Sequence, residues 1–178
     1  MQEVKSVQVR NILKIVVSAL CLVAVSALTL YVVLGWSSIP EQVPINYDAR
    51  GQIAGTDGKG SLIGLLVFIW FMQIFETYMI FRPLSKGGAV AATHFGLRGG
   101  GLRFNLGVNA AKKNPVAANN AIIDMMLVLM PVITVGFSRL VVCAVRVQPV
   151  GILFLPLFIS GVILPILITV IRLVRISL

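Results

Sequence analysis

Charged residues are scarce in this chain, and acidic residues are the scarcest of them. Only 12% of the 178 residues are charged, with 6 Asp and Glu against 15 Lys and Arg. A soluble domain of this length carries about 25% charged residues. The deficit, together with 58% hydrophobic residues and a mean hydropathy of +0.98, excludes an ordinary water-soluble domain and indicates a chain that lies in a bilayer.

Residue types that carry catalysis and metal binding are also few. The two cysteines, Cys21 and Cys143, fall inside apolar runs and have no metal-ligand spacing. The one histidine, His94, has no Cys, Asp or Glu near it in sequence. A catalytic histidine or a metal site needs such partners. The sequence therefore predicts no enzyme activity, no cofactor and no metal.

The net charge of +9 has a simpler explanation than nucleic-acid binding. The basic residues flank the apolar runs, where they set membrane topology and meet anionic lipid head groups. We therefore expect a lipid bilayer as a partner and no nucleic acid.

Long apolar runs are what the chain has in abundance. Four of them are long enough to cross a bilayer, at residues 15–35, 61–81, 121–145 and 150–171. At 1.5 Å per residue, a helix of about 21 residues covers about 31 Å, which matches the hydrocarbon thickness. Helices also satisfy their own backbone polar groups. The predicted fold is all-α: a single four-helix membrane domain over residues 1–178.

The basic residues are distributed unevenly between the two ends of these runs. With a cytoplasmic N-terminus, eleven Lys and Arg fall inside and four fall outside. Cytoplasmic loops carry the excess of Lys and Arg in membrane proteins. We therefore expect both termini in the cytoplasm and the loop 37–60 outside.

The connection between the second and third runs, residues 82–120, is basic and rich in Gly, Ala and Asn. It is too apolar for a solvated loop, and no unbroken part of it is long enough to span. We expect it to lie along the inner membrane surface, with Arg98, Arg103, Lys112 and Lys113 at lipid head groups. A re-entrant or partner-bound segment is the alternative.

The sequence of the loop 37–60 predicts a β-hairpin. Residues Val43, Ile45 and Tyr47 alternate as on one face of a strand. Residues 48–51 then supply a turn that ends in glycine, and residues 52–53 can return as a second strand.

Prolines and a second turn frame this hairpin. Pro40 and Pro44 keep the entry extended, because proline fixes φ and restrains the residue before it. Asp57-Gly58 predicts another turn just before the second apolar run. The loop is either a cap on the helix ends or a binding surface, and its candidate partner-binding residues are Pro40, Pro44, Asn46, Tyr47, Asp48, Gly51 and Lys59.

The same loop carries a resemblance to a known family. The order Ile39-Pro40-x-x-Val43-Pro44-x-x-Tyr47-x-x-x-Gly51, followed by Gly55, Gly58 and Lys59, resembles the extracytoplasmic loop of the SdpI-like immunity protein family. The resemblance implies a polytopic protein of the bacterial cytoplasmic (inner) membrane. The family usually has His where this chain has Asn46, and Trp where it has Thr56-Asp57, so any role of that histidine is absent here.

Polar residues inside the apolar runs are the other candidates for function. Gln73 and Glu76 share a helix face, and Asp124 is expected about one turn into the third run, at a similar depth near the cytoplasmic boundary. Ionisable residues in spans usually face a bundle interior or mark a pathway. Glu76 and Asp124 either form a proton or cation relay, or reach the interface and pair with basic residues there, namely Arg82, Lys86 or Lys113.

Arg139 lies near the opposite end of the third run. It can extend to the outer interface, or it can pair with an acidic residue of the outer loop such as Asp48 or Asp57.

Three functions follow from these observations. The favoured one is an accessory or structural subunit of a larger membrane assembly, of secretion or energy-transducing type, because the sparse soluble surface suits contacts with other membrane-protein subunits. The second is an immunity or signalling protein that binds an extracytoplasmic protein or peptide through the loop 37–60. The third is a small transporter that uses Glu76 and Asp124.

Overall fold

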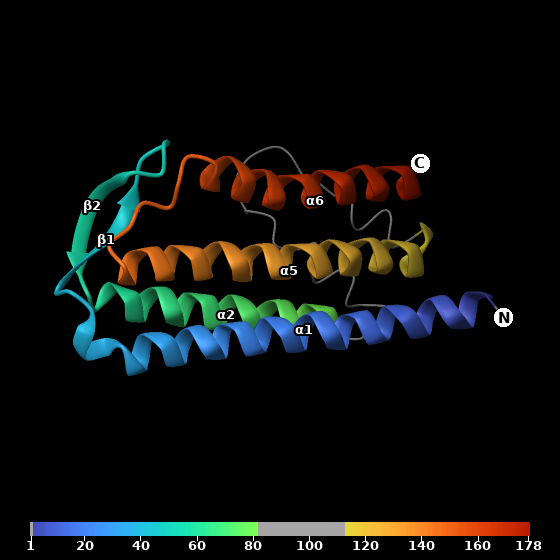
Figure 1. Ribbon diagram of the computed structural model, residues 1–178. Helices are drawn as coiled ribbons and strands as arrows, with labels where there is room; N and C mark the ends of the chain where they lie inside the picture. The colour runs from blue at the N-terminus through green and yellow to red at the C-terminus, as the bar shows by residue number, and fades with distance from the viewer. Residues whose placement is uncertain (1, 82–112) are drawn as a thin grey trace, which may run out of the picture.

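The computed structural model describes residues 2–81 and 113–178, and most of them are helical (Figure 1). Four helices are long and apolar enough to cross a membrane. This confirms the predicted all-α class with four membrane-spanning helices. The helices are α1 (Gln2–Leu34), α2 (Ser61–Phe81), α5 (Pro115–Val145) and α6 (Phe154–Ser177).

The four helices run side by side, and the two ends of the bundle differ (Figure 1). One end carries a short hairpin and is called the cap end. Both chain termini lie at the other end, which is called the terminal end.

Three of the helices are longer at the terminal end than the apolar runs predict. α1 begins at Gln2 rather than residue 15, and α6 continues to Ser177 rather than residue 171. α5 begins at Pro115 rather than residue 121, because the Asn114 side chain caps it by accepting the N–H of Ala117 at 3.0 Å. Asn before a proline at the first helical position is a helix-start signal that hydropathy alone does not detect.

The start of α6 differs in the other direction. It begins at Phe154 rather than residue 150, and Gly151 in the preceding connection has a φ of 93°. That backbone conformation suits glycine and interrupts the helix. Pro156 then falls in the first turn of α6, where a missing N–H removes no helical hydrogen bond.

α5 is the central helix of the bundle. It packs against both α1 and α2, and α6 packs mainly against α5. In the most apolar stretch of each helix, 39% of the α5 residues are buried but only 11% of the α6 residues. The core is therefore a three-helix unit of α1, α2 and α5, with α6 attached to one side.

Glycine makes the α5–α6 contact close. A Cβ at Gly136 would lie 2.2 Å from the Phe158 ring, so only glycine admits that ring against α5. Phe158 also meets Phe137 edge to face, with ring centroids 5.9 Å apart.

Buried apolar side chains form two separate clusters along the three-helix core. The cap-end cluster contains Val25, Leu28, Val32, Ile39, Val43, Leu62, Leu66, Ile69, Val141 and Ala144. The terminal-end cluster is smaller and contains Cys21, Ile80, Ile123, Leu127 and Met130. Burial of such side chains contributes about 25 cal/mol per Å² of apolar area removed from water, and within the bilayer close packing takes over that role.

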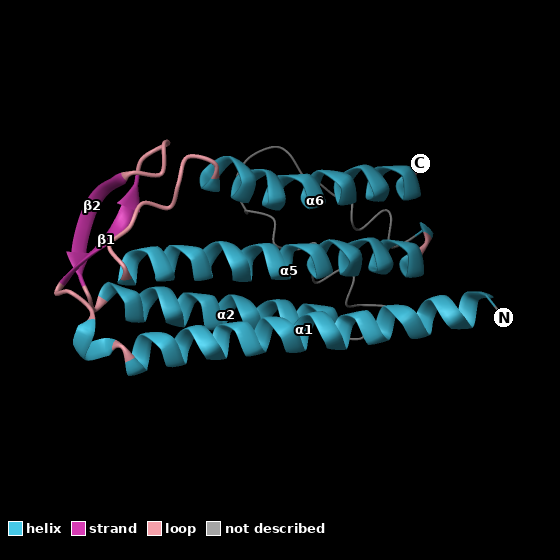
Figure 2. Ribbon diagram, viewed as in Figure 1, coloured by secondary structure: helices cyan, strands magenta, loops and turns pink. Residues whose placement is uncertain are grey.

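The loop between α1 and α2 forms a two-stranded antiparallel hairpin, β1 (Gln42–Tyr47) and β2 (Ile53–Gly58), after a 3₁₀ turn at Trp36–Ser38 (Figure 2). The predicted hairpin is confirmed. The second turn was wrongly placed, because Asp57 and Gly58 belong to β2 and the chain turns at residues 59–60.

The predicted alternation within β1 is also wrong. Val43 and its neighbour Pro44 are both buried, while Ile45 is 41% exposed. The pairing register shifts on both sides of Asn46, and such a bulge changes which face each side chain takes.

Candidate functional site

The tip of the hairpin is held by Asp48. Its carboxylate accepts the N–H groups of Arg50 and Gln52, each at 2.8 Å. The Asp48 carbonyl accepts the N–H of Gly51, whose φ of 73° needs glycine. Asp48 therefore shapes the turn that the sequence predicts.

Gly51 also ties the hairpin to the connection between α5 and α6. Its carbonyl accepts the N–H of Val150 at 3.0 Å, and a Cβ on Gly51 would lie 2.4 Å from the carbonyl oxygen of Gly151. The hairpin tip and the α5–α6 connection are thus in backbone contact, with no room for a side chain between them.

Lys59 closes the base of the hairpin. Its Nζ lies 2.7 Å from a carboxylate oxygen of Glu41 and 5.6 Å from the centre of the Trp36 ring. Its backbone N–H donates to the Glu41 carbonyl at 2.9 Å. A cation over an aromatic face is attracted by the ring quadrupole, so Lys59 joins the 3₁₀ turn, β1 and the start of α2.

Pro44 and Tyr47 line a pocket of about 330 Å³ between the hairpin and the cap ends of α2 and α5, together with Ile45, Ser61, Leu62, Gly64, Leu65, Phe68, Leu140 and Ala144. The Tyr47 hydroxyl donates to the Pro44 carbonyl at 3.5 Å. Burial, helped by the nearby Cys143 thiol, raises the pKa of Tyr47 to about 12. Pro40 and Asn46 are exposed.

Five of the seven cap residues singled out in the sequence therefore have a structural role, whereas Pro40 and Asn46 are exposed. Asp48, Gly51 and Lys59 hold the hairpin together, whereas Pro44 and Tyr47 form part of a pocket.

A second candidate site is a polar layer inside the three-helix core, defined here as Gln73, Glu76 and Thr77 of α2 and Thr134 of α5. The Gln73 amide Nε2 donates to Thr77 Oγ1 at 3.3 Å, and its Oε1 accepts the hydroxyl of Thr134 at 3.3 Å. Gln73 is only 2% exposed, so these bonds lie inside the bundle.

Glu76 is buried in the same layer, with 3% of its surface exposed. Its Oε2 has no hydrogen-bond partner among the residues that the structure describes. The Asn119 and Ser138 side chains also hold a buried oxygen without a partner, but both are neutral. Among the described residues, Glu76 is thus the only acidic side chain with a buried oxygen that lacks a hydrogen-bond partner.

The interfacial pairing predicted for Glu76 is wrong where the structure tests it. The Lys113 amine donates to the carbonyl of Leu178 at the C-terminus instead. The other two predicted partners, Arg82 and Lys86, lie outside the described residues.

α1 contributes to this layer in a way that the sequence analysis missed. The Cys21 thiol is buried in the terminal-end cluster, within electrostatic reach of the Thr134 side chain and the Glu76 carboxyl. One turn away, the buried Ser18 hydroxyl donates to the Met130 sulfur at 3.8 Å. Small polar residues three apart in an otherwise apolar helix were the available signal.

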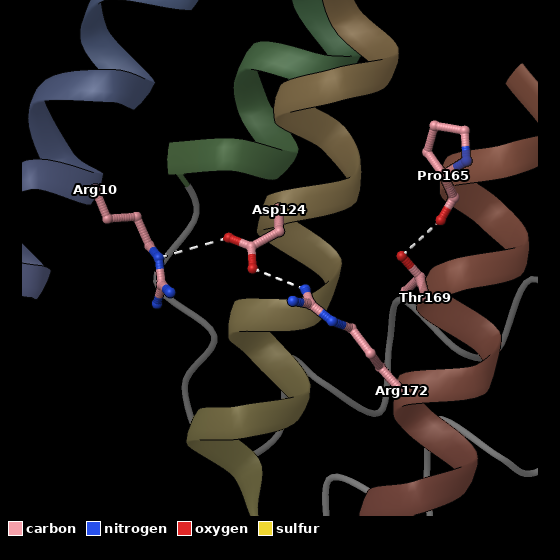
Figure 3. A network of polar contacts seen from close by, with 5 residues as sticks. All are labelled: Arg10, Asp124, Pro165, Thr169 and Arg172. Carbon is pink, nitrogen blue, oxygen red and sulfur yellow. Dashed lines mark hydrogen bonds and ion pairs between the residues drawn. The ribbon is translucent and has the colours of Figure 1, made fainter. Parts of the chain in front are cut away.

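Asp124 has a different environment, shown in Figure 3. Its Oδ2 lies 3.0 Å from Nη1 of Arg172 on α6, and its Oδ1 lies 3.6 Å from Nε of Arg10 on α1. The predicted pairing of Asp124 with a basic residue is correct in kind. The predicted partner Lys113 was wrong, because Asp124 joins three helices rather than pairing within the connection before α5.

Two residues that precede Arg172 on α6, Pro165 and Thr169, are drawn in the same view (Figure 3). The buried Thr169 hydroxyl donates to the carbonyl of Pro165 at 2.8 Å. The bond satisfies the buried hydroxyl within its own helix, the usual arrangement for a threonine in a helix interior.

The two carboxyl groups are not at a similar depth, contrary to the sequence prediction. The Gln73–Thr134 hydrogen bond sets the register of the antiparallel helices α2 and α5. Counting from it, Asp124 lies about 10 Å closer to the terminal end than Glu76, at 1.5 Å per residue. The error arose because the facing ends of α2 and α5 are not level: by this register α5 begins eleven residues beyond the level of Phe81.

Arg139 is exposed and lines a groove of about 770 Å³ between α5 and the start of α6. Arg139 pairs with neither of its predicted acidic partners, Asp48 and Asp57, and it makes no ion pair among the described residues. The Asp48 carboxylate is bonded within its own turn, and Asp57 accepts the N–H of Gly58.

Of the predicted lipid head-group residues, Arg98, Arg103 and Lys112 lie outside the described residues, as does most of the connection 82–120. Lys113 is exposed at the terminal end. Within residues 2–81 and 113–178, no group of three or more His, Cys, Asp or Glu could hold a metal ion.

Comparisons of the chain with protein-family models, with curated proteins and with solved structures found no match. The resemblance of the loop 37–60 to the SdpI-like family therefore stays a prediction that depends on the loop residues alone.

Proposed function

We propose that this chain is a non-enzymatic protein of the bacterial cytoplasmic membrane that binds another protein at its cap end, as an accessory subunit of a larger assembly. The orientation follows from charge. Of the 15 Lys and Arg in the sequence, eleven fall on the side of the termini, and four, Arg50, Lys59, Arg139 and Arg146, fall on the side of the cap. The positive-inside rule then puts the termini in the cytoplasm and the cap outside.

The observation that carries the proposal is apolar surface on the hairpin. Ile45 is 41% exposed and Ile53 is 39% exposed, although both lie beyond the ends of the helices. Ile45 lines the pocket beside Tyr47, and Ile53 pairs with Tyr47 across the strands. A patch of apolar and aromatic side chains with a polar rim is typical of protein-binding surfaces.

The structure of the cap suits a preformed binding surface. Its tip is fixed by the Gly51–Val150 hydrogen bond, and its base by the Lys59–Glu41 ion pair. Val43 anchors it in the cap-end cluster. A surface held in this way loses little conformational freedom when a partner docks.

Site-specific photo-crosslinking in native membranes tests the proposal. A photoreactive residue at position 45 should yield one discrete protein adduct. The same residue at position 56, exposed on β2, is the matched control and should yield less. Lipid adducts alone, or equal yields at both positions, would contradict the proposal.

Substitution of Tyr47 sharpens the experiment. Tyr47→Ala removes an aromatic side chain from the pocket and should lower the yield at position 45 about tenfold, as expected for an aromatic anchor. Tyr47→Phe keeps the ring and should retain the adduct. The adduct's mass and peptides then distinguish a stable subunit from the extracytoplasmic protein or peptide of an immunity-type function.

The transporter alternative draws its support from one observation, the burial of Glu76. Against it, the cap-end and terminal-end clusters enclose the polar layer on both sides in the described part of the chain. We therefore favour the binding function.

A further inference from the structure

The polar layer lies between two apolar clusters, and α2 and α5 show the same order. On α2, Ile69 belongs to the cap-end cluster and Ile80 to the terminal-end cluster, with Gln73 and Glu76 between them. On α5, Thr134 lies between Met130 and Val141, which belong to different clusters. The Glu76 carboxyl is therefore enclosed along the bundle axis as well as from its sides.

No cation faces this carboxyl from the elements packed against it, as far as the chain is described. α1 offers the Cys21 thiol and α5 offers the Thr134 hydroxyl. The nearest charged residue toward the terminal end of α1 is Lys14, about 10 Å along the axis from Cys21 by its seven-residue separation.

The charged residues of α5 are also unsuited to balance Glu76. Asp124 is acidic and is held by Arg10 and Arg172. Arg139 is exposed and lines the groove toward α6. A carboxylate at Glu76 would thus be buried without a counter-ion, and an isolated buried charge costs several kcal/mol.

A protonated carboxyl avoids this cost, and losing the proton requires water to reach the site. The shorter route is from the terminal end. Glu76 is five residues, or about 7.5 Å, from the end of α2 at Phe81, but about 22 Å from its start at Ser61. Among the described residues, five buried side chains form the terminal-end cluster, against ten in the cap-end cluster.

The α5 helix lacks one backbone hydrogen bond at the depth of Glu76, because it contains Pro131. Pro131 lies three residues before Thr134, and Glu76 lies three residues after Gln73, so the register of the Gln73–Thr134 bond puts Pro131 and Glu76 at one level. A proline has no N–H to donate to the carbonyl four residues earlier, here that of Leu127, and helices bend most readily at such positions.

We propose that Glu76 is a proton-binding site, and that release of its proton opens the terminal-end half of the three-helix core to water. On release the O–H bond of the carboxyl breaks and the proton passes to an entering water molecule, with no change of oxidation state. The hydrated carboxylate is stable only with the terminal-end cluster parted. Binding of the proton closes it again. The proposal is independent of what docks at the cap.

Cys21 is a built-in reporter of this opening, because its thiol is buried in the terminal-end cluster within electrostatic reach of Glu76. In a Cys143→Ser background, the rate of alkylation of Cys21 by a membrane-permeant maleimide is measured in lipid vesicles over a range of pH. At each pH, the alkylation rate is divided by the rate measured for the Glu76→Gln variant. The ratio removes the increase in rate that comes from ionisation of the thiol itself. Glu76→Leu serves as a second reference should the glutamine variant not fold.

The proposal predicts a ratio near one in mildly acidic buffer that rises about tenfold as the pH becomes alkaline. A Cys21→Ser background, with Cys143 as the reporter at the cap end, should keep a ratio of one throughout. Two results would overturn the proposal. A constant Cys21 ratio means that Glu76 does not exchange its proton, and a ratio that falls below one means that its charge opposes the thiolate without any opening.

Discussion

Asp124 and Glu76 are both acidic residues in membrane-spanning helices, yet their surroundings are opposite. Asp124 is flanked by two arginines from two other helices, and 37% of its side chain is exposed. Glu76 is 3% exposed, and one of its oxygens has no partner in the described chain. The comparison shows that one acid holds helices together as a charge, whereas the other suits the core only when neutral.

The largest expected effect comes from reversing the charge at Glu76. Glu76→Lys puts an ammonium group in the polar layer without an anion and should lower the free energy of unfolding by about 3 kcal/mol or more. Asp124→Lys should cost less, because water reaches that position. Reversible unfolding of both variants in lipid bilayers measures the difference. Equal losses would remove the distinction between the two sites.

Removing the charge at Asp124 should have a moderate effect. Asp124→Asn leaves Arg10 and Arg172 without their acidic partner and should lower the free energy of unfolding by about 1 kcal/mol, because partly exposed ion pairs contribute little. The loss should shrink at high salt. In a double-mutant cycle with Arg172→Gln, the two losses should not add; strict additivity would show that the 3.0 Å contact contributes no stability.

Tyr47 extends the comparison to an acid outside the helices. Its pKa is raised to about 12 by burial, so folding favours the protonated phenol. The resulting stability is fully present below about pH 10, the ordinary value, and is lost as pH rises through 12. Because Tyr47 is partly exposed, the loss should stay below about 1 kcal/mol.

Tyr47→Phe tests that pH dependence. The variant should lack this part of the alkaline destabilisation, and subtracting its phenolate absorbance titration from that of the parent chain should give a midpoint near 12. A midpoint at the ordinary value of about 10 would show that the cap opens before Tyr47 ionises.

The smallest effect is expected for Glu76→Gln. Glutamine has the shape of a protonated glutamic acid and is also neutral, so the free energy of unfolding near neutral pH should change by less than about 0.5 kcal/mol. Asp124→Asn, the same chemical change at the paired site, is the matched control. A large loss at Glu76 would imply that a charged carboxylate stabilises the core.

The spanning helices could be predicted because hydropathy directly reports the cost of exposing polar groups to lipid. The hairpin could be predicted because Asp48 and Gly51 supply turn chemistry that acts within four residues. Both signals are local. The missed start of α5 was local too, but it is encoded by the Asn114 cap rather than by hydropathy.

The candidate site was only half predictable. Gln73 and Glu76 stand out in any apolar run, but their depth depends on which residue of α5 lies opposite. Nothing near Gln73 in sequence specifies Thr134, 61 residues away, as its partner. Likewise, the register shifts at Asn46 do not follow from the alternation of apolar residues, which therefore gave the wrong burial for Ile45.

The most direct test of the contrast between the two acids is labelling by a hydrophobic carbodiimide, which reacts with protonated carboxyl groups in apolar surroundings. The purified protein is treated in lipid vesicles near neutral pH, and the modified residues are mapped by mass spectrometry. The structure predicts that Glu76 is modified and that Asp124, held between Arg10 and Arg172, is not. Modification of Asp124 with Glu76 left intact would contradict the account.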